Sequence, residues 1–232
     1  MKKIKLLFFV FVLVAFISCK DESGEFARPV LSDSDMVLGI RDCLNISLDT
    51  ANAHLAVPNG FYQYKGSAYR IRIPAHVEMI IDTLIEYGEK ELIDSLIIRM
   101  NRMAEANGTI YKTQIGSLIT KTSFPDPRRI ITGNNSAASE YFKSVQFLPL
   151  IDILKPILAE SMENFGVNSC WHEIITFYGI YDSTPLMLDL SYEITRQIAE
   201  NIITEMAAEE RLIRLHESHR KTNLLKKIFA HN

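Results

Sequence analysis

The feature that most constrains this 232-residue chain is an apolar stripe in residues 190–215. Apolar side chains recur at every fourth position of this stretch, namely Leu190, Ile194, Ile198, Ile202 and Met206. Such spacing places them on one face of an α-helix, and Ala199, Ile203 and Ala207 widen that face. A wide face with small residues predicts a helix that packs closely against more than one neighbour. We therefore expect the fold to be organised around this long C-terminal helix.

Both ends of this helix carry local signals. Asp189 can accept a hydrogen bond from a free backbone N–H at the start of the helix. Arg211 and Arg214 lie near its end, where the helix macrodipole favours cations. The sequence therefore predicts the boundaries of the helix as well as its buried face.

Composition and charge limit the class of protein. The chain is 47% hydrophobic and 23% charged, which suits a globular protein with one sizeable core. Its net charge is −3, and removal of Lys2, Lys3 and Lys5 with a leader would leave 22 basic and 28 acidic residues, a net charge of −6. Lysine and arginine supply most of the affinity for nucleic acid, so we expect no nucleic-acid partner.

The N-terminus has the pattern of an exported protein. Residues 1–18 carry three lysines followed by an apolar run at residues 6–17, which is typical of a signal peptide and short for a membrane span. The segment Phe16-Ile17-Ser18-Cys19 resembles the lipobox of bacterial lipoproteins, so Cys19 is the expected lipidation site. A plain secretory peptide with an incidental cysteine is the alternative. The predicted organisation is a signal peptide at 1–18, a lipidated tether at 19–33 and a helical domain at 34–232.

The residues after Cys19 bear on localisation. Lys20-Asp21-Glu22 is similar to the signal that sends lipoproteins of the Bacteroidetes type to the cell surface, and a solvated charged tether is the competing interpretation. We expect an outer-membrane lipoprotein in the cell envelope, either periplasmic or surface-exposed. Its first partner would be the membrane, reached through the lipid anchor.

The rest of the chain is predicted to be mainly all-α: a single multi-helix bundle around the long C-terminal helix, with one short β-hairpin. Ser32 or Ser34 can cap a first helix that ends near Ala56. Further helical segments are predicted at 74–87, 89–106, 110–119, 127–133, 136–146, 147–165, 168–178 and 222–229. Pro156 predicts a kink or break in the segment 147–165.

The one β signal is the stretch FYQYKGSAYRIRIP at residues 61–74, which alternates apolar and polar residues around a Lys-Gly-Ser turn. Tyr62, Tyr64 and Tyr69 of this stretch would form an exposed patch for stacking or sugar binding, or would fold onto the helical body, which we favour. Cys43 and Cys170 are expected to be separate core thiols, although an oxidising compartment would permit a disulfide.

Several short motifs identify a family. They are Asn59-Gly60-Phe61, Ile71-Arg72-Ile73-Pro74, Met100-Asn101-Arg102-Met103-Ala104-Glu105, Gly133-Asn134, Ala137-Ala138-Ser139-Glu140-Tyr141-Phe142, Phe165-Gly166-Val167 and Arg220-Lys221-Thr222-Asn223-Leu224-Leu225-Lys226-Lys227-Ile228-Phe229. In order and spacing they resemble the bacterial family called domain of unknown function 4197, over roughly residues 38–229. Ser47, where the family tends to have Gly, is a departure. The resemblance implies an exported, mostly helical protein and supplies no activity.

No catalytic motif is present: the sequence has no G-x-S-x-G elbow, no Walker loop and no G-x-G-x-x-G. His216 and His219 are three residues apart and could share a metal, but a structural zinc site needs more ligands than these. We favour a solvated helix end for this pair and expect no metal and no cofactor. The most interesting polar residues form a predicted cluster: Asn101, Arg102, Glu105, Asn134 and Glu140.

Two functions are compatible with this pattern. The first is a non-enzymatic envelope lipoprotein whose body binds an unknown protein or small molecule, or acts as a scaffold. The second is a hydrolase or transferase with an unrecognised carboxylate site near Asn101, Glu105 and Glu140. A pocket that converges on those residues would favour the enzyme, whereas a packed seam would favour an architectural role. We favour the first and assign no catalytic residue.

Overall fold

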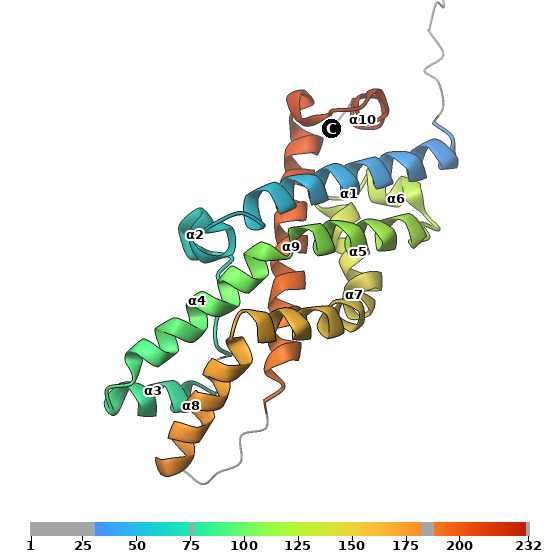
Figure 1. Cartoon of the computed structure of the whole chain (residues 1–232). Helices are drawn as coiled ribbons and strands as arrows, with labels where there is room; N and C mark the ends of the chain where they lie inside the picture. Colours follow the sequence, from blue (N-terminus) through green and yellow to red (C-terminus); the bar gives the residue numbers. More distant parts are fainter. Residues whose placement is uncertain (1–30, 75–76, 182–187, 231–232) are drawn as a thin grey trace, which may run out of the picture. The chain divides into compact units, whose positions relative to one another are not determined.

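The long C-terminal helix predicted from the apolar stripe is α9, Leu190–Leu215. Its first turn is capped by Asp189, whose Oδ1 accepts a hydrogen bond from the backbone N–H of Tyr192 at 2.9 Å. The stripe from Leu190 to Met206 is buried. Helix α9 packs chiefly against α1 (Asp33–Leu55) and α7 (Ala137–Asn164), and Figure 1 shows α1 crossing it. The central position expected for this helix is confirmed.

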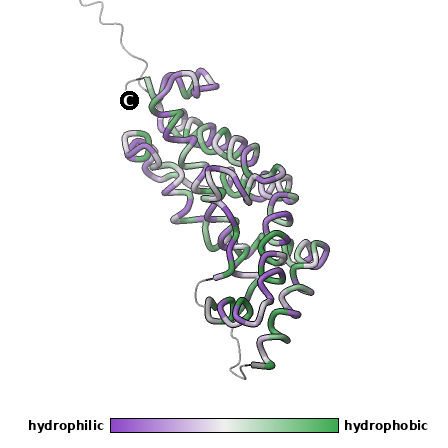
Figure 2. The backbone as a smooth tube through the Cα atoms, turned by 90° about the vertical axis from the view of Figure 1, so that its left-hand side faces the viewer, coloured by the Kyte–Doolittle hydropathy of each residue, from purple (hydrophilic) through white to green (hydrophobic). Residues whose placement is uncertain are grey.

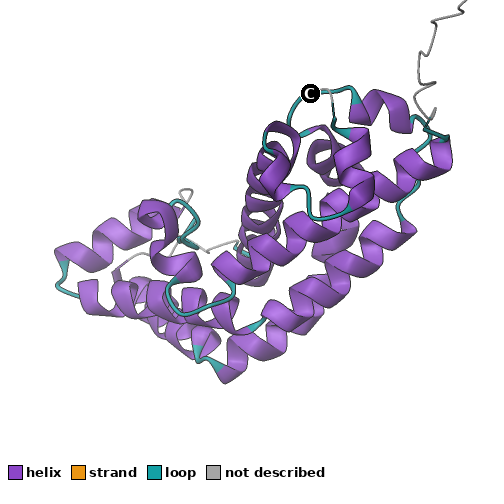
Figure 3. Cartoon of the chain, turned by 90° about the horizontal axis from the view of Figure 1, so that it is seen from above, coloured by secondary structure: helices purple, strands orange, loops and turns teal. Residues whose placement is uncertain are grey.

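The computed structural model describes residues 31–74, 77–181 and 188–230. The remaining helices in these ranges are α2 (Gly60–Ser67), α3 (Glu78–Glu86), α4 (Lys90–Ala106), α5 (Gly108–Lys121), α6 (Pro127–Ile131), α8 (Val167–Tyr181), the 3₁₀ turn η2 (Glu217–His219) and α10 (Asn223–Ile228). Figure 3 shows helices and loops throughout these ranges and no strand. The all-α class is therefore confirmed. The predicted signal peptide and Cys19 lie outside the described residues.

Helix starts follow the capping signals of the sequence. Ser32 and Asp35 form a capping box at α1: the Ser32 hydroxyl accepts from the N–H of Asp35 at 3.1 Å, and the Asp35 carboxylate accepts from the N–H of Ser32 at 3.3 Å. Asp126 caps α6 through the N–H of Arg129 at 3.0 Å. Gly88 stops α3 with a φ of 86°, a left-handed conformation that glycine adopts without strain.

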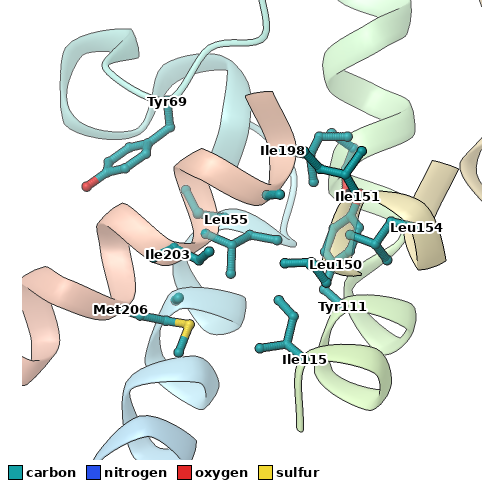
Figure 4. Packing of buried hydrophobic residues seen from close by; sticks show 14 of the residues in the cluster. Leu55, Tyr69, Tyr111, Ile115, Leu150, Ile151, Leu154, Ile198, Ile203 and Met206 are labelled. Atoms are coloured by element: carbon teal, nitrogen blue, oxygen red, sulfur yellow. Dashed lines mark hydrogen bonds between the residues drawn. The ribbon is translucent and has the colours of Figure 1, made fainter. Parts of the chain in front are cut away.

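The core lies where α1, α5, α7 and α9 meet. Figure 4 shows Leu55 of α1 and Met206 of α9 beside Tyr111 and Ile115 of α5 and Leu150 of α7. Along the helices in Figure 2, hydrophobic and hydrophilic residues interleave, as amphipathic segments with one buried face require. Cys43 and Cys170 are both buried and free, as expected for separate core thiols.

The predicted hairpin at residues 61–74 is wrong. Residues 60–67 form α2, in which Lys65, Gly66 and Ser67 have positive φ angles of 48°, 67° and 68°. The chain is then extended over residues 70–74 without pairing to a strand. Left-handed geometry at Lys65 and Ser67 is unusual for residues with a Cβ and needs support from surrounding contacts.

Side-chain amides take the place of a partner strand for this extended segment. Asn101 of α4 accepts from the N–H of Ile71 and donates to its carbonyl, both at 2.9 Å. Gln197 of α9 does the same for Arg72, accepting at 3.0 Å and donating at 2.9 Å. Because these amides satisfy the backbone N–H and C=O groups of Ile71 and Arg72, this part of the segment needs no partner strand.

Two helix boundaries differ from expectation. Helix α3 begins at Glu78 rather than near Pro74, which lies in the extended segment. The two segments predicted at 136–146 and 147–165 are one helix, α7, with Pro149 and Pro156 inside it. Its ribbon changes direction along its length in Figure 1, because each proline removes a backbone donor and crowds the preceding turn. Burial of Leu150 and Leu154 keeps the helix continuous.

Candidate functional site

The residues of the predicted polar cluster fall into two separate groups. Asn101, Arg102 and Glu105 lie on α4, whereas Asn134 and Glu140 lie at the start of α7. Among the described residues no hydrogen bond or ion pair joins the two groups. The structure therefore does not assemble the five residues into one site.

The α4 group holds the segment after α1 in place. Asn101 is fully buried and bound to the backbone of Ile71, as described above. Glu105 is also buried, and its Oε1 accepts from the N–H of Tyr62 at 3.1 Å while its Oε2 accepts from Arg102 at 2.5 Å. Arg102 in turn donates to the side-chain oxygen of Asn59 at 2.7 Å. These contacts account for both carboxylate oxygens of Glu105.

A shallow cavity lies beside this group. It has a volume of about 260 Å³ and is lined by Ala56, Val57, Pro58, Arg102, Glu105, Ala106 and Phe165. Its apolar lining contributes no further titratable group, and Glu105 is already bound on both oxygens. General acid–base chemistry requires a group within reach of the substrate proton and free to exchange it, which this arrangement does not supply.

The second group lines a larger cavity of about 590 Å³. Here Glu140 accepts from the Ser136 hydroxyl at 2.6 Å and from the Asn134 amide at 3.0 Å. These two bonds lower the pKa of Glu140. Asn134 also accepts from the N–H of Ser136 at 2.8 Å, which fixes the turn before α7. Glu140 is thus an exposed carboxylate held in one orientation by uncharged donors.

The three tyrosines of the predicted aromatic patch lie in different surroundings. Tyr62 is half-buried, with the guanidinium groups of Arg70 and Arg102 over its ring at 4.2 Å and 5.5 Å. Tyr64 and Tyr69 stack on each other with ring centroids 5.7 Å apart. Tyr69 is only 7% exposed, and Figure 4 shows its hydroxyl directed away from the apolar cluster.

The hydroxyls of Tyr64 and Tyr69 lead to a cluster that sequence reasoning missed. Its centre is Glu205, which lies on α9 and is 2% exposed. Four side chains donate to its carboxylate: His54 at 2.8 Å, Tyr64 at 3.0 Å, Lys65 at 2.8 Å and Tyr69. We call these five residues the Glu205 cluster.

Electrostatics in the Glu205 cluster follow from this geometry. Burial raises the pKa of Glu205, but the hydrogen bonds from Lys65, Tyr69, His54 and Tyr64 outweigh burial and hold the pKa below its ordinary value. Burial and then the bond to Glu205 raise the pKa of Tyr69 to about 12 and also raise that of Tyr64. Burial disfavours the charge of Lys65, yet Glu205 raises its pKa above the ordinary value. At neutral pH the cluster therefore holds an ionised carboxylate and a protonated lysine.

The signal for this cluster was present on α9. Glu205 follows Ile202 by three residues and precedes Met206, so it falls on the buried stripe. A carboxylate on such a face needs donors. Its donors lie 136 to 151 residues away in sequence, and no local pattern identifies them.

A second buried carboxylate lies further along the same helix. Glu210 accepts from the backbone N–H groups of Ala138 at 2.9 Å and Ser139 at 2.7 Å, at the start of α7, and from Arg214 at 2.8 Å. Arg214 also donates to the carbonyls of Ile131 and Ile130 in α6, at 2.8 Å and 3.0 Å. Both charged side chains have no solvent exposure. This pair joins α6, α7 and α9.

The histidine pair predicted to be a solvated helix end lies at η2. His219 contacts Glu209 at 3.0 Å, and its ring centroid is 6.3 Å from that of His216. Within the described ranges, no group of three or more histidine, cysteine or carboxylate side chains is arranged to hold a metal ion.

Comparison with known families identifies the family to which these residues belong. The family described as "Protein of unknown function (DUF4197)" matches residues 30–230. The chain belongs to the DUF4197 family. The match confirms the resemblance carried by motifs such as Met100-Asn101-Arg102-Met103-Ala104-Glu105, which this DUF4197 protein uses to hold the segment after α1. Neither a curated protein nor a solved structure matches the chain.

The family is described only as one of unknown function, so membership assigns no activity to this DUF4197 protein. None of its described helices is both long enough and apolar enough to cross a membrane.

Proposed function

We propose that this chain is a cell-envelope lipoprotein, anchored to the outer membrane through Cys19, whose helical body binds a protein or small molecule or serves as a scaffold. Support for the anchor comes from the N-terminal sequence, in which residues 1–18 have the pattern of a signal peptide and Phe16-Ile17-Ser18-Cys19 resembles a lipobox. A single acyl chain gives only marginal membrane binding, so stable anchoring requires more than one chain on this cysteine or further contacts.

One observation supports a binding or scaffold role over catalysis. The buried carboxylates of the described residues are all bound by donors that hold the fold together. They are Glu105, Glu205, Glu209 and Glu210. Buried acids that serve as catalysts face a cleft with their proton free to move, whereas these groups cap helices or fix loops. The polar interior is therefore best explained as architecture.

This geometry does not support the alternative, a hydrolase or transferase with a carboxylate site near Asn101, Glu105 and Glu140. Asn101 and Glu105 are engaged with the backbone of Ile71 and Tyr62, and Glu140 lies on a different helix with other partners. A two-carboxylate mechanism needs both groups at one substrate, which this arrangement does not provide.

The anchor is tested by replacing Cys19. In cells fed radiolabelled palmitate, the unaltered chain should incorporate label and enter the detergent phase on phase separation, whereas Cys19→Ala should do neither. Cys43→Ala is the matched control, because Cys43 is buried in α1 and should leave labelling unchanged. Equal labelling of Cys19→Ala and the unaltered chain would refute the proposed anchor.

Localisation is tested separately. Density-gradient separation of the membranes should place the unaltered chain in the outer-membrane fraction. Protease treatment of intact cells then distinguishes a surface-exposed from a periplasmic body, and replacement of Lys20, Asp21 and Glu22 by alanine shows whether these residues act as an export signal or as a tether. Recovery of the chain in the inner-membrane fraction would contradict the proposed location.

A further inference from the structure

The cavity beside Glu140 has the size and lining of a ligand site. Its volume of about 590 Å³ falls within the range of about 300 to 1,000 Å³ that small-molecule pockets occupy. It lies between α6, the turn that follows α6, and the first turns of α7. It is lined by Pro125, Asp126, Arg129, Ile130, Gly133, Asn134, Ala137, Glu140, Tyr141 and Ser144.

Glu140 presents a negative charge that has no ion-pair partner among the described residues. Its donors are the Ser136 hydroxyl at 2.6 Å and the Asn134 amide at 3.0 Å, both uncharged, and no described lysine, arginine or histidine forms an ion pair with it. The two bonds fix the carboxylate and favour its ionised form. A carboxylate has about four acceptor positions, so Glu140 retains capacity for a further donor.

Arg129, which lines the same cavity, supplies the opposite charge. Its backbone N–H is used to cap α6, donating to Asp126 at 3.0 Å, but its guanidinium makes no hydrogen bond or ion pair with any described residue. The side chain is exposed. Because an arginine carries five N–H donors suited to a carboxylate, Arg129 is available to bind an anionic group.

Of the remaining lining, Asp126, Asn134 and Ser144 are polar and hydrogen-bonded within the protein, and the other side chains are apolar or aromatic. Ile130 is buried at 7% exposure, and Tyr141 packs on Phe124 with ring centroids 5.5 Å apart. The Tyr141 hydroxyl is committed to the carbonyl of Ser123 at 2.9 Å, so this residue offers its ring rather than its hydroxyl. The cavity thus combines an anion and a cation that lack ion-pair partners within the described ranges with an apolar surface.

We propose that this cavity binds a small zwitterion, namely an apolar amino acid or short peptide. The ligand ammonium would bind Glu140, the ligand carboxylate would bind Arg129, and the apolar side chain would lie against Tyr141 and Ile130. A ligand with a single charge would leave one of these two side chains unpaired, so the arrangement favours a ligand with both. This inference rests on the proposed binding role of the helical body and is independent of the lipid anchor.

The test separates the two charges of the ligand. Isothermal titration calorimetry on the full chain in detergent compares alanylphenylalanine with its N-acetyl form, which lacks the ammonium, and with its amide, which lacks the carboxylate. Phenylalanine itself tests the size of the site. We expect alanylphenylalanine to bind, and each modified form to bind at least about tenfold more weakly. This is the usual cost of losing one hydrogen bond to a charged group.

Two variants assign each charge. In Glu140→Gln, the dipeptide and its N-acetyl form should bind equally, because the ammonium has lost its partner. In Arg129→Gln, the dipeptide and its amide should bind equally. Glu160→Gln and Arg128→Gln are matched controls, because both residues are exposed and lie outside the cavity, and both variants should bind as the unaltered chain does.

Three outcomes would overturn the proposal. The first is no binding of alanylphenylalanine or phenylalanine up to about 10 mM, a concentration well into the weak-binding range. The second is equal binding of all three dipeptide forms by the unaltered chain. The third is binding of a neutral sugar such as methyl glucoside that is lost in Glu140→Gln, which would assign the cavity to hydroxyl-rich ligands. None of these results would affect palmitate labelling at Cys19, so failure here is distinguishable from failure of the proposed anchor.

Discussion

Two of the buried carboxylates on helix α9, Glu205 and Glu210, lie less than two turns apart, and the protein stabilises them in different ways. Glu210 is held by backbone N–H groups at the start of α7 and by Arg214, a cation with no exposure. Glu205 is held only by side chains, and two of these, His54 and Lys65, are 40% and 46% exposed.

The difference shows how surroundings set the behaviour of a single residue type. The partners of Glu210 do not titrate in the working pH range of proteins, because arginine stays protonated and backbone amides do not ionise. The partners of Glu205 are ionisable, and two of them, His54 and Lys65, reach solvent. We therefore expect the loss of a Glu210 partner to cost more unfolding free energy than the loss of a Glu205 partner, and the contribution of the Glu205 cluster to vary with pH and salt.

The largest expected effect is that of Arg214→Met. This change leaves the Glu210 carboxylate buried without its cation and frees the carbonyls of Ile130 and Ile131. Breaking a buried pair in this way typically costs about 3 to 5 kcal/mol of unfolding free energy. Urea denaturation measures the loss. Arg211→Met, on the exposed side of the same helix, is the control and should change stability by about 0.5 kcal/mol or less. A similar small change for Arg214→Met would contradict the assigned role.

The next effect is that of Glu205→Gln. An amide keeps the shape of the side chain but loses the charge that binds Lys65, and its N–H₂ meets groups that are themselves donors. We expect a loss of about 1.5 to 3 kcal/mol in the same denaturation experiment, which is the range for hydrogen bonds to a charged group. Glu217→Gln, at an exposed position, should be neutral. A loss larger than that of Arg214→Met would reverse the proposed order of the two sites.

The pH dependence of stability sharpens the comparison further. The pKa of Tyr69 is raised to about 12 in the folded protein, and that of Tyr64 is also raised. A raised folded-state pKa contributes stability that is fully present below the unfolded value of about 10 and is lost as pH rises through the folded value. Urea midpoints should therefore fall between about pH 10 and pH 12.

The acid side has the opposite sign. The pKa of Glu205 is lowered in the folded protein, so its contribution is present above the ordinary glutamate value and is lost as pH falls below about 4.5. Glu205→Gln should flatten both limbs of the pH profile, whereas Tyr69→Phe should flatten the alkaline limb more than the acid one. Profiles that are unchanged in both variants would show that the cluster does not couple protonation to folding.

The smallest expected effect is that of Lys65→Met. The Lys65 side chain is 46% exposed, and a pair with such a cation contributes about 1 kcal/mol or less. The loss should shrink further in about 1 M salt, where screening acts over about 3 Å, whereas the cost of Arg214→Met should not change with salt. Lys226→Met, exposed on α10, is the control. A salt-independent loss for Lys65→Met would place its contact with Glu205 among the buried pairs.

Most of the helical fold could be predicted because its signals are local. The spacing of Leu190, Ile194 and Ile198 identifies a buried face without reference to the rest of the chain, and capping by Asp189 involves the next turn only. The prediction of a hairpin was wrong because the partner of this segment is not set by local sequence. Alternation in residues 61–74 shows that the segment can be extended, but whether its partner is a strand or the amides of Asn101 and Gln197 depends on α4 and α9.

The candidate sites also divide into those built from local sequence, which could be predicted, and those built from distant segments, which could not. Asn134, Ser136 and Glu140 lie within seven residues of one another, and the sequence indicated two of the three. The Glu205 cluster could not be predicted from the sequence, because its members are brought together only by the packing of α1 and α2 on α9. Hydrophobic periodicity reports which face of a helix is buried, and it carries no information about which distant donor meets a carboxylate on that face.

By itself, therefore, the sequence determined the all-α class, the family and the long helix at the centre of the chain, because each rests on spacing within a few turns or on motifs that can be read in order. Only the tertiary structure decided that the polar residues of α4 serve as architecture, that Glu205 gathers its four donors, and that Arg129 and Glu140 line one cavity. The physical reason is that burial along a helix has a fixed period, whereas the pairing of charges depends on contacts between segments far apart in the chain.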